Sequence, residues 1–201
     1  MGTFNLSSIV SALPEATQRL LLAAAAAAPE DLPLFLGSLS EHALADWVPA
    51  ERSGLVRLDA TGTRPLLWGD PDTPRALYEA APFVDRQAAH RLLADTLTRR
   101  ADRRAWHLAA ATLGPDEPVA AALEDAADAA RVDGGWAGAA RTLERSAELS
   151  PDSTDAARRY LLAMRAAMYA GDGTWVGRLG ARAADLTDDL SLSLEAGLAS
   201  G

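Results

Sequence analysis

The chain has 201 residues, of which 49% are hydrophobic and 23% charged, and its formal net charge is −9. This length and composition predict one or two globular domains with a buried core, and the negative charge argues against nucleic-acid binding over most of the surface. Cysteine and lysine are both absent, which excludes disulfides, cysteine nucleophiles, thiolate metal sites, a phosphate-loop lysine and Schiff-base catalysis.

The N-terminal part of the sequence predicts four helices before residue 50. The first is expected over roughly 5–12, and the second opens at Pro14 and ends before Pro29, since proline suits a first helical turn and stops a helix. The segments EDLPLFLGSLS and EHALADWV predict two more short helices. The most apolar run, Leu20 to Ala28, is shorter than the roughly 18 residues of a spanning helix. Since no signal peptide is recognisable either, we expect a cytoplasmic protein without membrane contact.

The period of the apolar residues changes after residue 54. Leu55, Val56 and Leu58 precede a Thr-Gly turn, and a second apolar run follows it. This pattern predicts a short β-hairpin with its turn near residues 59–63. Beyond it, Thr73 is expected to cap a helix that has proline at its first position. The segment PFVDRQAAHRLLADTLTRR predicts a long amphipathic helix.

From residue 101 onward the sequence predicts only helices, with Asp116, Ser153 and Thr174 as their N-caps. Their expected ranges are about 101–113, 116–132, 136–149, 153–170, 174–187 and 190–199.

A weak internal repeat lies in this helical part. Trp136 and Gly138 match Trp175 and Gly177, with an offset of 37 to 39 residues between the matching segments. Tetratricopeptide (TPR) helix pairs recur about every 34 residues and stack on their neighbours. The repeat therefore predicts an irregular TPR-like antiparallel helical array.

Residues that could carry catalysis or bind a metal are few. The histidines at 42, 90 and 107 are far apart in the sequence, whereas a zinc site needs about four closely spaced ligands. No Gly-x-Ser-x-Gly segment or glycine-rich phosphate loop is present. We expect no enzyme activity, no metal and no cofactor.

A cluster of four arginines begins the helical part. On a helix, residues four apart are neighbours, so the cluster could bind a phosphate or a protein partner. The alternative is a solvated face, or ion pairs with acidic helices. The arginines are Arg99, Arg100, Arg103 and Arg104, and the acidic candidates include Glu124, Asp125 and Asp128.

Several segments, in order along residues 10 to 172, together resemble one family. They include ALPEATQRLLLAAAA, PAERSGLVRLD, ALYEAAPFVDRQAAHRLLADTL and AAMYAGD, together with the long stretch from Asp102 to Asp152. These segments resemble the middle region of large LuxR-type transcriptional regulators of actinobacteria, which are multidomain STAND-type ATPases similar in layout to MalT. The resemblance implies a winged-helix-like domain over residues 1–100 and the start of a TPR-like sensor region over residues 101–201, which would be incomplete here.

The sequence departs from this family in three respects. It has no nucleotide-binding domain and no C-terminal helix-turn-helix. In addition, Asp70 stands where the family carries a histidine that is thought to sense the nucleotide. A carboxylate would repel a phosphate unless a cation lay between them, so a degenerate or repurposed module is expected.

We therefore expect a mainly α protein that acts as a non-catalytic regulatory or protein-interaction module. Its partner would be a protein or a small-molecule inducer. Two alternatives remain at this stage. One is DNA binding through the winged-helix-like half, although the candidate recognition segment from Pro33 to Trp47 carries no arginine. The other is a repurposed ligand-binding protein or small enzyme with a pocket near the hairpin. That pocket would be lined by Trp68, Asp70, Asp72, Arg75, Tyr78 and His90.

A homodimer is also possible. An apolar face formed by Leu190, Leu194 and Leu198 on the last expected helix could pack on a second copy.

Overall fold

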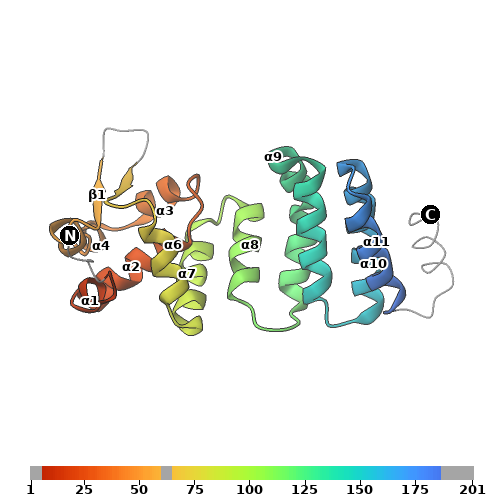
Figure 1. Ribbon diagram of the computed structural model, residues 1–201, viewed down its shortest axis with the longest axis horizontal. Helices are drawn as coiled ribbons and strands as arrows, with labels where there is room; N and C mark the ends of the chain where they lie inside the picture. Colours follow the sequence, from red (N-terminus) through yellow and green to blue (C-terminus); the bar gives the residue numbers. More distant parts are fainter. Residues whose placement is uncertain (1–5, 60–64, 187–201) are drawn as a thin grey trace. The chain divides into compact units, whose positions relative to one another are not determined.

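The computed structural model describes residues 6–59 and 65–186. These residues are mainly helical, with one antiparallel hairpin followed by packed antiparallel helices, which confirms the predicted fold class (Figure 1). The chain forms two compact units, Met1–Arg99 and Arg100–Gly201.

The first unit contains seven described helices and the hairpin. They are α1 (Leu6–Ser11), α2 (Glu15–Ala26), α3 (Leu32–Ser38), α4 (Glu41–Ala45), α5 (Val48–Arg52), β1 (Val56–Leu58), β2 (Leu66–Trp68), α6 (Thr73–Ala80) and α7 (Phe83–Thr96). Helix α2 packs against α6 and α7. Because the largest of the core side chains, Trp47 and Phe35, are completely buried together with Leu21 and Leu93, this unit has a hydrophobic core of its own.

The hairpin is short and antiparallel. Val56 pairs with Trp68, and Leu58 pairs with Leu66. The Glu51 carboxylate accepts a hydrogen bond from the Leu58 backbone N–H over 2.9 Å, which ties α5 to β1. Residues 60–64, which include most of the turn expected near 59–63, lie outside the described residues.

Two local predictions for the first unit were wrong. Helix α5 was not expected, although proline lies in its first turn, where its missing N–H costs nothing. Helix α6 begins at Thr73, which is therefore not the cap; Asp72 occupies that position, and its side chain makes no capping hydrogen bond.

The second unit contains four described helices: α8 (Ala101–Ala111), α9 (Glu117–Leu149), α10 (Ser153–Ala170) and α11 (Gly173–Ala184). Helix α9 is broken at Gly135, where φ is 64° and ψ is −165°. Only glycine adopts this backbone region readily. The predicted division into helices 116–132 and 136–149 is thereby confirmed. We call residues 117–134 the first half of α9 and residues 136–149 its second half.

The two halves of α9 fold back on each other. The Ser146 hydroxyl donates to the Ala120 carbonyl over 2.6 Å, and Gly138 lies against the Ala130 carbonyl. These two contacts join residues in opposite chain order, so the halves are antiparallel.

Three aspartates cap the helices of this unit. Asp116 accepts from the Val119 N–H, as predicted. Asp152 caps α10 and Asp172 caps α11, whereas Ser153 and Thr174 lie one and two positions further along, inside the helices. At the start of α10 and of α11 the sequence offers two capping residues, adjacent at Asp152 and Ser153 and two apart at Asp172 and Thr174, and the predictions of Ser153 and Thr174 were wrong. The expected helix 190–199, with Leu190, Leu194 and Leu198, lies outside the described residues.

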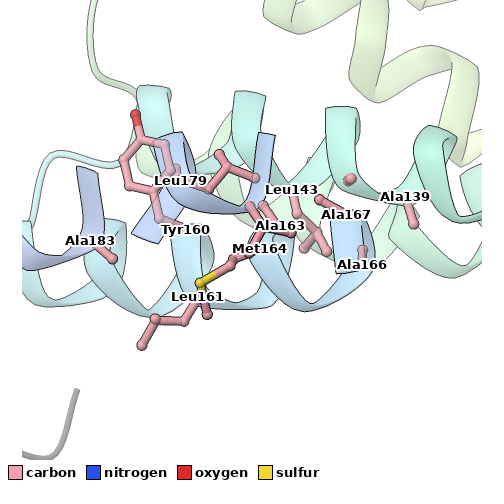
Figure 2. Packing of buried hydrophobic residues seen from close by; sticks show 13 residues of the cluster. Ala139, Leu143, Tyr160, Leu161, Ala163, Met164, Ala166, Ala167, Leu179 and Ala183 are labelled. Carbon is pink, nitrogen blue, oxygen red and sulfur yellow. The ribbon is translucent and has the colours of Figure 1, made fainter. Parts of the chain in front are cut away.

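The core of the second unit has two clusters of side chains. Helix α8 packs on α9 around Leu123 and Ala105. The second half of α9 packs with α10 and α11 around Leu143, Met164 and Leu179 (Figure 2). Alanine is frequent in both clusters, which lets the helices approach closely.

Candidate functional site

The four arginines predicted as a partner site do not form a free basic patch. Within the second unit, the Arg100 guanidinium lies 3.1 Å from Asp102 and 3.4 Å from Asp133. Arg103 lies 3.8 Å from Asp102 and 3.9 Å from Asp133. Burial raises the pKa of Asp102, but hydrogen bonds from Arg100 and from the backbone outweigh it, so the pKa of that carboxyl lies below its usual value.

The remaining arginines of the cluster, Arg99 and Arg104, are exposed, and Arg99 ends the first unit. Ion pairing was the alternative expected for this cluster, but it involves Asp133 instead of Glu124, Asp125 or Asp128. The aspartates therefore neutralise part of the positive charge that a phosphate site would need.

The residues predicted near the hairpin make local contacts with one another. The Asp70 carboxylate accepts from the Asp72 N–H over 2.8 Å, which is a turn contact. Arg75 lies 3.7 Å from Asp72 and 3.6 Å from Glu79, with all three side chains exposed. Such exposed pairs contribute little to stability, and nothing in their geometry indicates catalysis.

Tyr78 and His90 form the best-defined polar contact of this region. The Tyr78 hydroxyl lies 2.8 Å from His90 Nε2, the two rings are edge-on at 5.7 Å, and the Arg86 guanidinium lies over the Tyr78 ring at 5.5 Å. His90 is buried. The contact joins α6 to α7 and indicates a structural role.

Replacing Tyr78 by phenylalanine should lower the free energy of unfolding by about 1 kcal/mol, because it removes one hydrogen bond to a buried group and leaves the ring in place. Urea unfolding of the intact chain measures this change. The exposed Phe83→Leu variant, in the same unit, serves as the control and should stay close to the wild type. A Tyr78→Phe protein as stable as the wild type would contradict a structural role for the contact.

An open, apolar groove of about 500 Å³ lies beside the hairpin. Its lining is Ala24, Ala25, Ala27, Pro29, Leu32, Pro65, Leu66, Leu67, Trp68, Pro71 and Pro74. Of the six residues predicted to form a pocket, only Trp68 belongs to it. None of the described residues that line the groove with Trp68 has a titratable side chain.

The structure describes no cluster of three or more histidine, cysteine or carboxylate side chains that could hold a metal ion, and this statement covers residues 6–59 and 65–186. Over the same ranges, no helix has both the length and the apolar character needed to cross a bilayer.

A buried ionic network in the second unit was missed by the sequence analysis. The Arg159 guanidinium is 3% exposed. It donates to Glu117 over 2.6 Å, to Glu124 over 2.8 Å and to the Ser150 hydroxyl over 2.6 Å. Arg158 donates to the same Glu124 carboxylate over 2.8 Å. The network joins the first half of α9 to α10 and is structural, since its polar atoms are engaged with one another.

An exposed aromatic pair was also missed. Trp136 and Tyr169 have ring centroids 4.6 Å apart, yet 42% of Trp136 and 64% of Tyr169 remain exposed. The Arg131 guanidinium lies over the Trp136 ring at 5.1 Å. In the sequence, Trp136 is distinguished only by its match with Trp175 in the repeat. Large exposed aromatics with an adjacent arginine are the residue types enriched at protein interfaces.

No protein-family model, no curated protein and no solved structure matches this chain.

Proposed function

We propose that this chain is a non-catalytic regulatory or protein-interaction module, related to the middle region of LuxR-type regulators. In this proposal the helical second unit presents a surface to a partner. The single observation that carries it is the exposed pair of Trp136 and Tyr169, flanked by Arg131.

The use of the polar side chains supports the proposal. The buried guanidinium of Arg159 is held by Glu117 and Glu124. Tyr78 and His90 contact each other. Tyr78, His90, Arg100 and Arg103 are thus engaged in contacts within their own units, while the aromatic pair leaves much of its apolar surface in water. Covering such surface is a main source of binding free energy.

The test is selection of peptides from a displayed random library on the intact chain. The double variant Trp136→Ala, Tyr169→Ala should bind the selected peptides at least about tenfold more weakly, because each aromatic at the centre of an interface contributes on the order of 2 kcal/mol. Phe83→Ala removes a comparably exposed aromatic of the first unit and should bind as the wild type does. Equal binding by all three proteins would refute the role of this surface.

A further inference from the structure

The first half of α9 and helix α10 run parallel and side by side. Glu124, within the first half of α9, contacts Arg158 of α10, and Trp136, just after the break that ends this half, contacts Tyr169 near the end of α10. The residues joined by each contact are separated by nearly the same number of positions along the chain. A constant separation is expected when two helices run in the same direction. Glu124 and Arg158 are 34 residues apart, and Arg131 and Arg165 have this same separation.

The equal separation leads us to infer that Arg131 and Arg165 lie at the same height on neighbouring helices, about one helical turn before the aromatic pair. Arg165 is exposed and precedes Tyr169 by four residues, so both side chains lie on one face of α10. Arg131 already contacts the Trp136 ring. From this spacing we infer that Arg165 shares an exposed surface with Arg131, Trp136 and Tyr169, which we call the Arg–Trp–Tyr surface.

The positive charge of this surface is poorly compensated. Arg131 forms an ion pair with Asp128 at 3.8 Å, and the Asp128 side chain is 98% exposed, so this pair contributes little. No residue of the described parts of the chain makes an ion pair or hydrogen bond with Arg165. By contrast, Arg158, about two helical turns before Arg165 on the same helix, is bound to Glu124.

We propose that the Arg–Trp–Tyr surface binds an acidic peptide segment in which a carboxylate stands next to an aromatic residue or a proline. This inference rests on the proposed function and names the chemistry of the partner. The carboxylate would accept hydrogen bonds from Arg131 and Arg165, and the apolar residue would lie on Trp136 and Tyr169. The guanidinium over Trp136 holds the ring in place for this contact.

The charges around the surface favour a peptide over a nucleic acid. Asp125 and Asp128 are exposed on the same half of α9, and the whole chain has a net charge of −9. A nucleic acid carries a charge on every nucleotide and needs a continuous basic track. A peptide with one or two carboxylates can place them at the two arginines and avoid the aspartates.

The experiment measures fluorescence anisotropy of a labelled peptide of alternating glutamate and tryptophan, titrated with the intact chain. A second peptide has glutamine in place of glutamate. We expect the glutamate peptide to bind at least about tenfold more tightly. The double variant Arg131→Gln, Arg165→Gln should lose this preference and bind the glutamate peptide about tenfold or more weakly, since charged hydrogen bonds are the strong ones. Arg91→Gln changes an exposed arginine of the first unit and should bind as the wild type does.

Three outcomes overturn the inference: equal affinity for both peptides, no effect of the arginine variant, or tight binding of a single-stranded oligonucleotide without binding of the glutamate peptide. Binding that requires Trp136 and Tyr169 but ignores charge would leave the proposed function in place and refute only the acidic partner. If the displayed library also yields no peptide that depends on the aromatic pair, both proposals fall. Circular dichroism of each variant confirms that the helices persist.

Discussion

Replacing Arg159 by methionine is expected to lower the free energy of unfolding of the second unit by about 3 kcal/mol, the range found when one partner of a buried ion pair is removed. The side chain is 3% exposed and bound to Glu117, Glu124 and Ser150. Methionine keeps most of the volume of the side chain. The decrease in the free energy of unfolding therefore comes from the missing charge and hydrogen bonds and not from a cavity. Urea unfolding followed by circular dichroism measures it.

The matched control is the neighbouring Arg158→Met. Arg158 binds the same Glu124 carboxylate, but its side chain is 43% exposed, so water replaces much of what is lost and we expect a change below about 1 kcal/mol. If the two variants unfold at the same urea concentration, burial does not distinguish them, and the network is not the link between α9 and α10 that the geometry indicates.

The Arg159→Met variant should also change how the free energy of unfolding depends on pH. Hydrogen bonds from Arg158 and then Arg159 lower the pKa of Glu124 from 4.5 to about 2, against the opposing effect of burial. Arg159 also lowers the pKa of Glu117. Because both carboxyls have a lower pKa in the folded state, their stabilisation is present above about pH 4.5 and is lost as the pH falls towards 2. Arg159→Met should therefore show a shallower loss of stability over this interval than the wild type, as urea midpoints at several pH values would reveal.

The parts of the fold that local chemistry determines could be predicted. The break in α9 lies at consecutive glycines, and the hairpin lies where the apolar period changes from helical to alternating. The caps show the limit of such reasoning. At Asp152 and Ser153 the chain places two capping residues in succession, and the backbone of the assembled unit decides which one precedes the helix.

The candidate site depended on contacts between distant residues, and these could not be predicted. Arg159 and Glu117 are 42 residues apart, and nothing in their immediate sequence distinguishes them from solvated charges. Trp136 was selected for its match with Trp175, but only packing decides that Trp175 donates its indole N–H to Glu144 while Trp136 stays largely exposed. The residues near the hairpin were predicted to form one pocket. In the structure Asp70 contacts Asp72 and Tyr78 contacts His90, in two separate places.

The glycines matched in the sequence repeat lead to the second large expected effect. Gly138→Ala should lower the free energy of unfolding of the second unit by about 2 kcal/mol. A Cβ at this position would lie 2.5 Å from the Ala130 carbonyl oxygen, and because that oxygen belongs to the backbone, the two halves of α9 would have to separate. Overpacking of this kind costs about 1–3 kcal/mol. The midpoint of urea unfolding measures the change.

Gly177→Ala is the matched control, since this glycine occupies the corresponding place in α11. Apart from its chain neighbours and the nearby backbone of its own helix, no described atom lies within 4 Å of the added Cβ. Alanine therefore only restricts the unfolded chain and should stabilise the unit by about 0.5–1 kcal/mol. The two substitutions should therefore change the free energy of unfolding in opposite directions, although the two glycines match in the sequence repeat. The reason is that Gly138 lies where two helices cross and Gly177 does not. Stabilisation by both substitutions would show that the halves of α9 do not approach as closely at Gly138 as the structure has them.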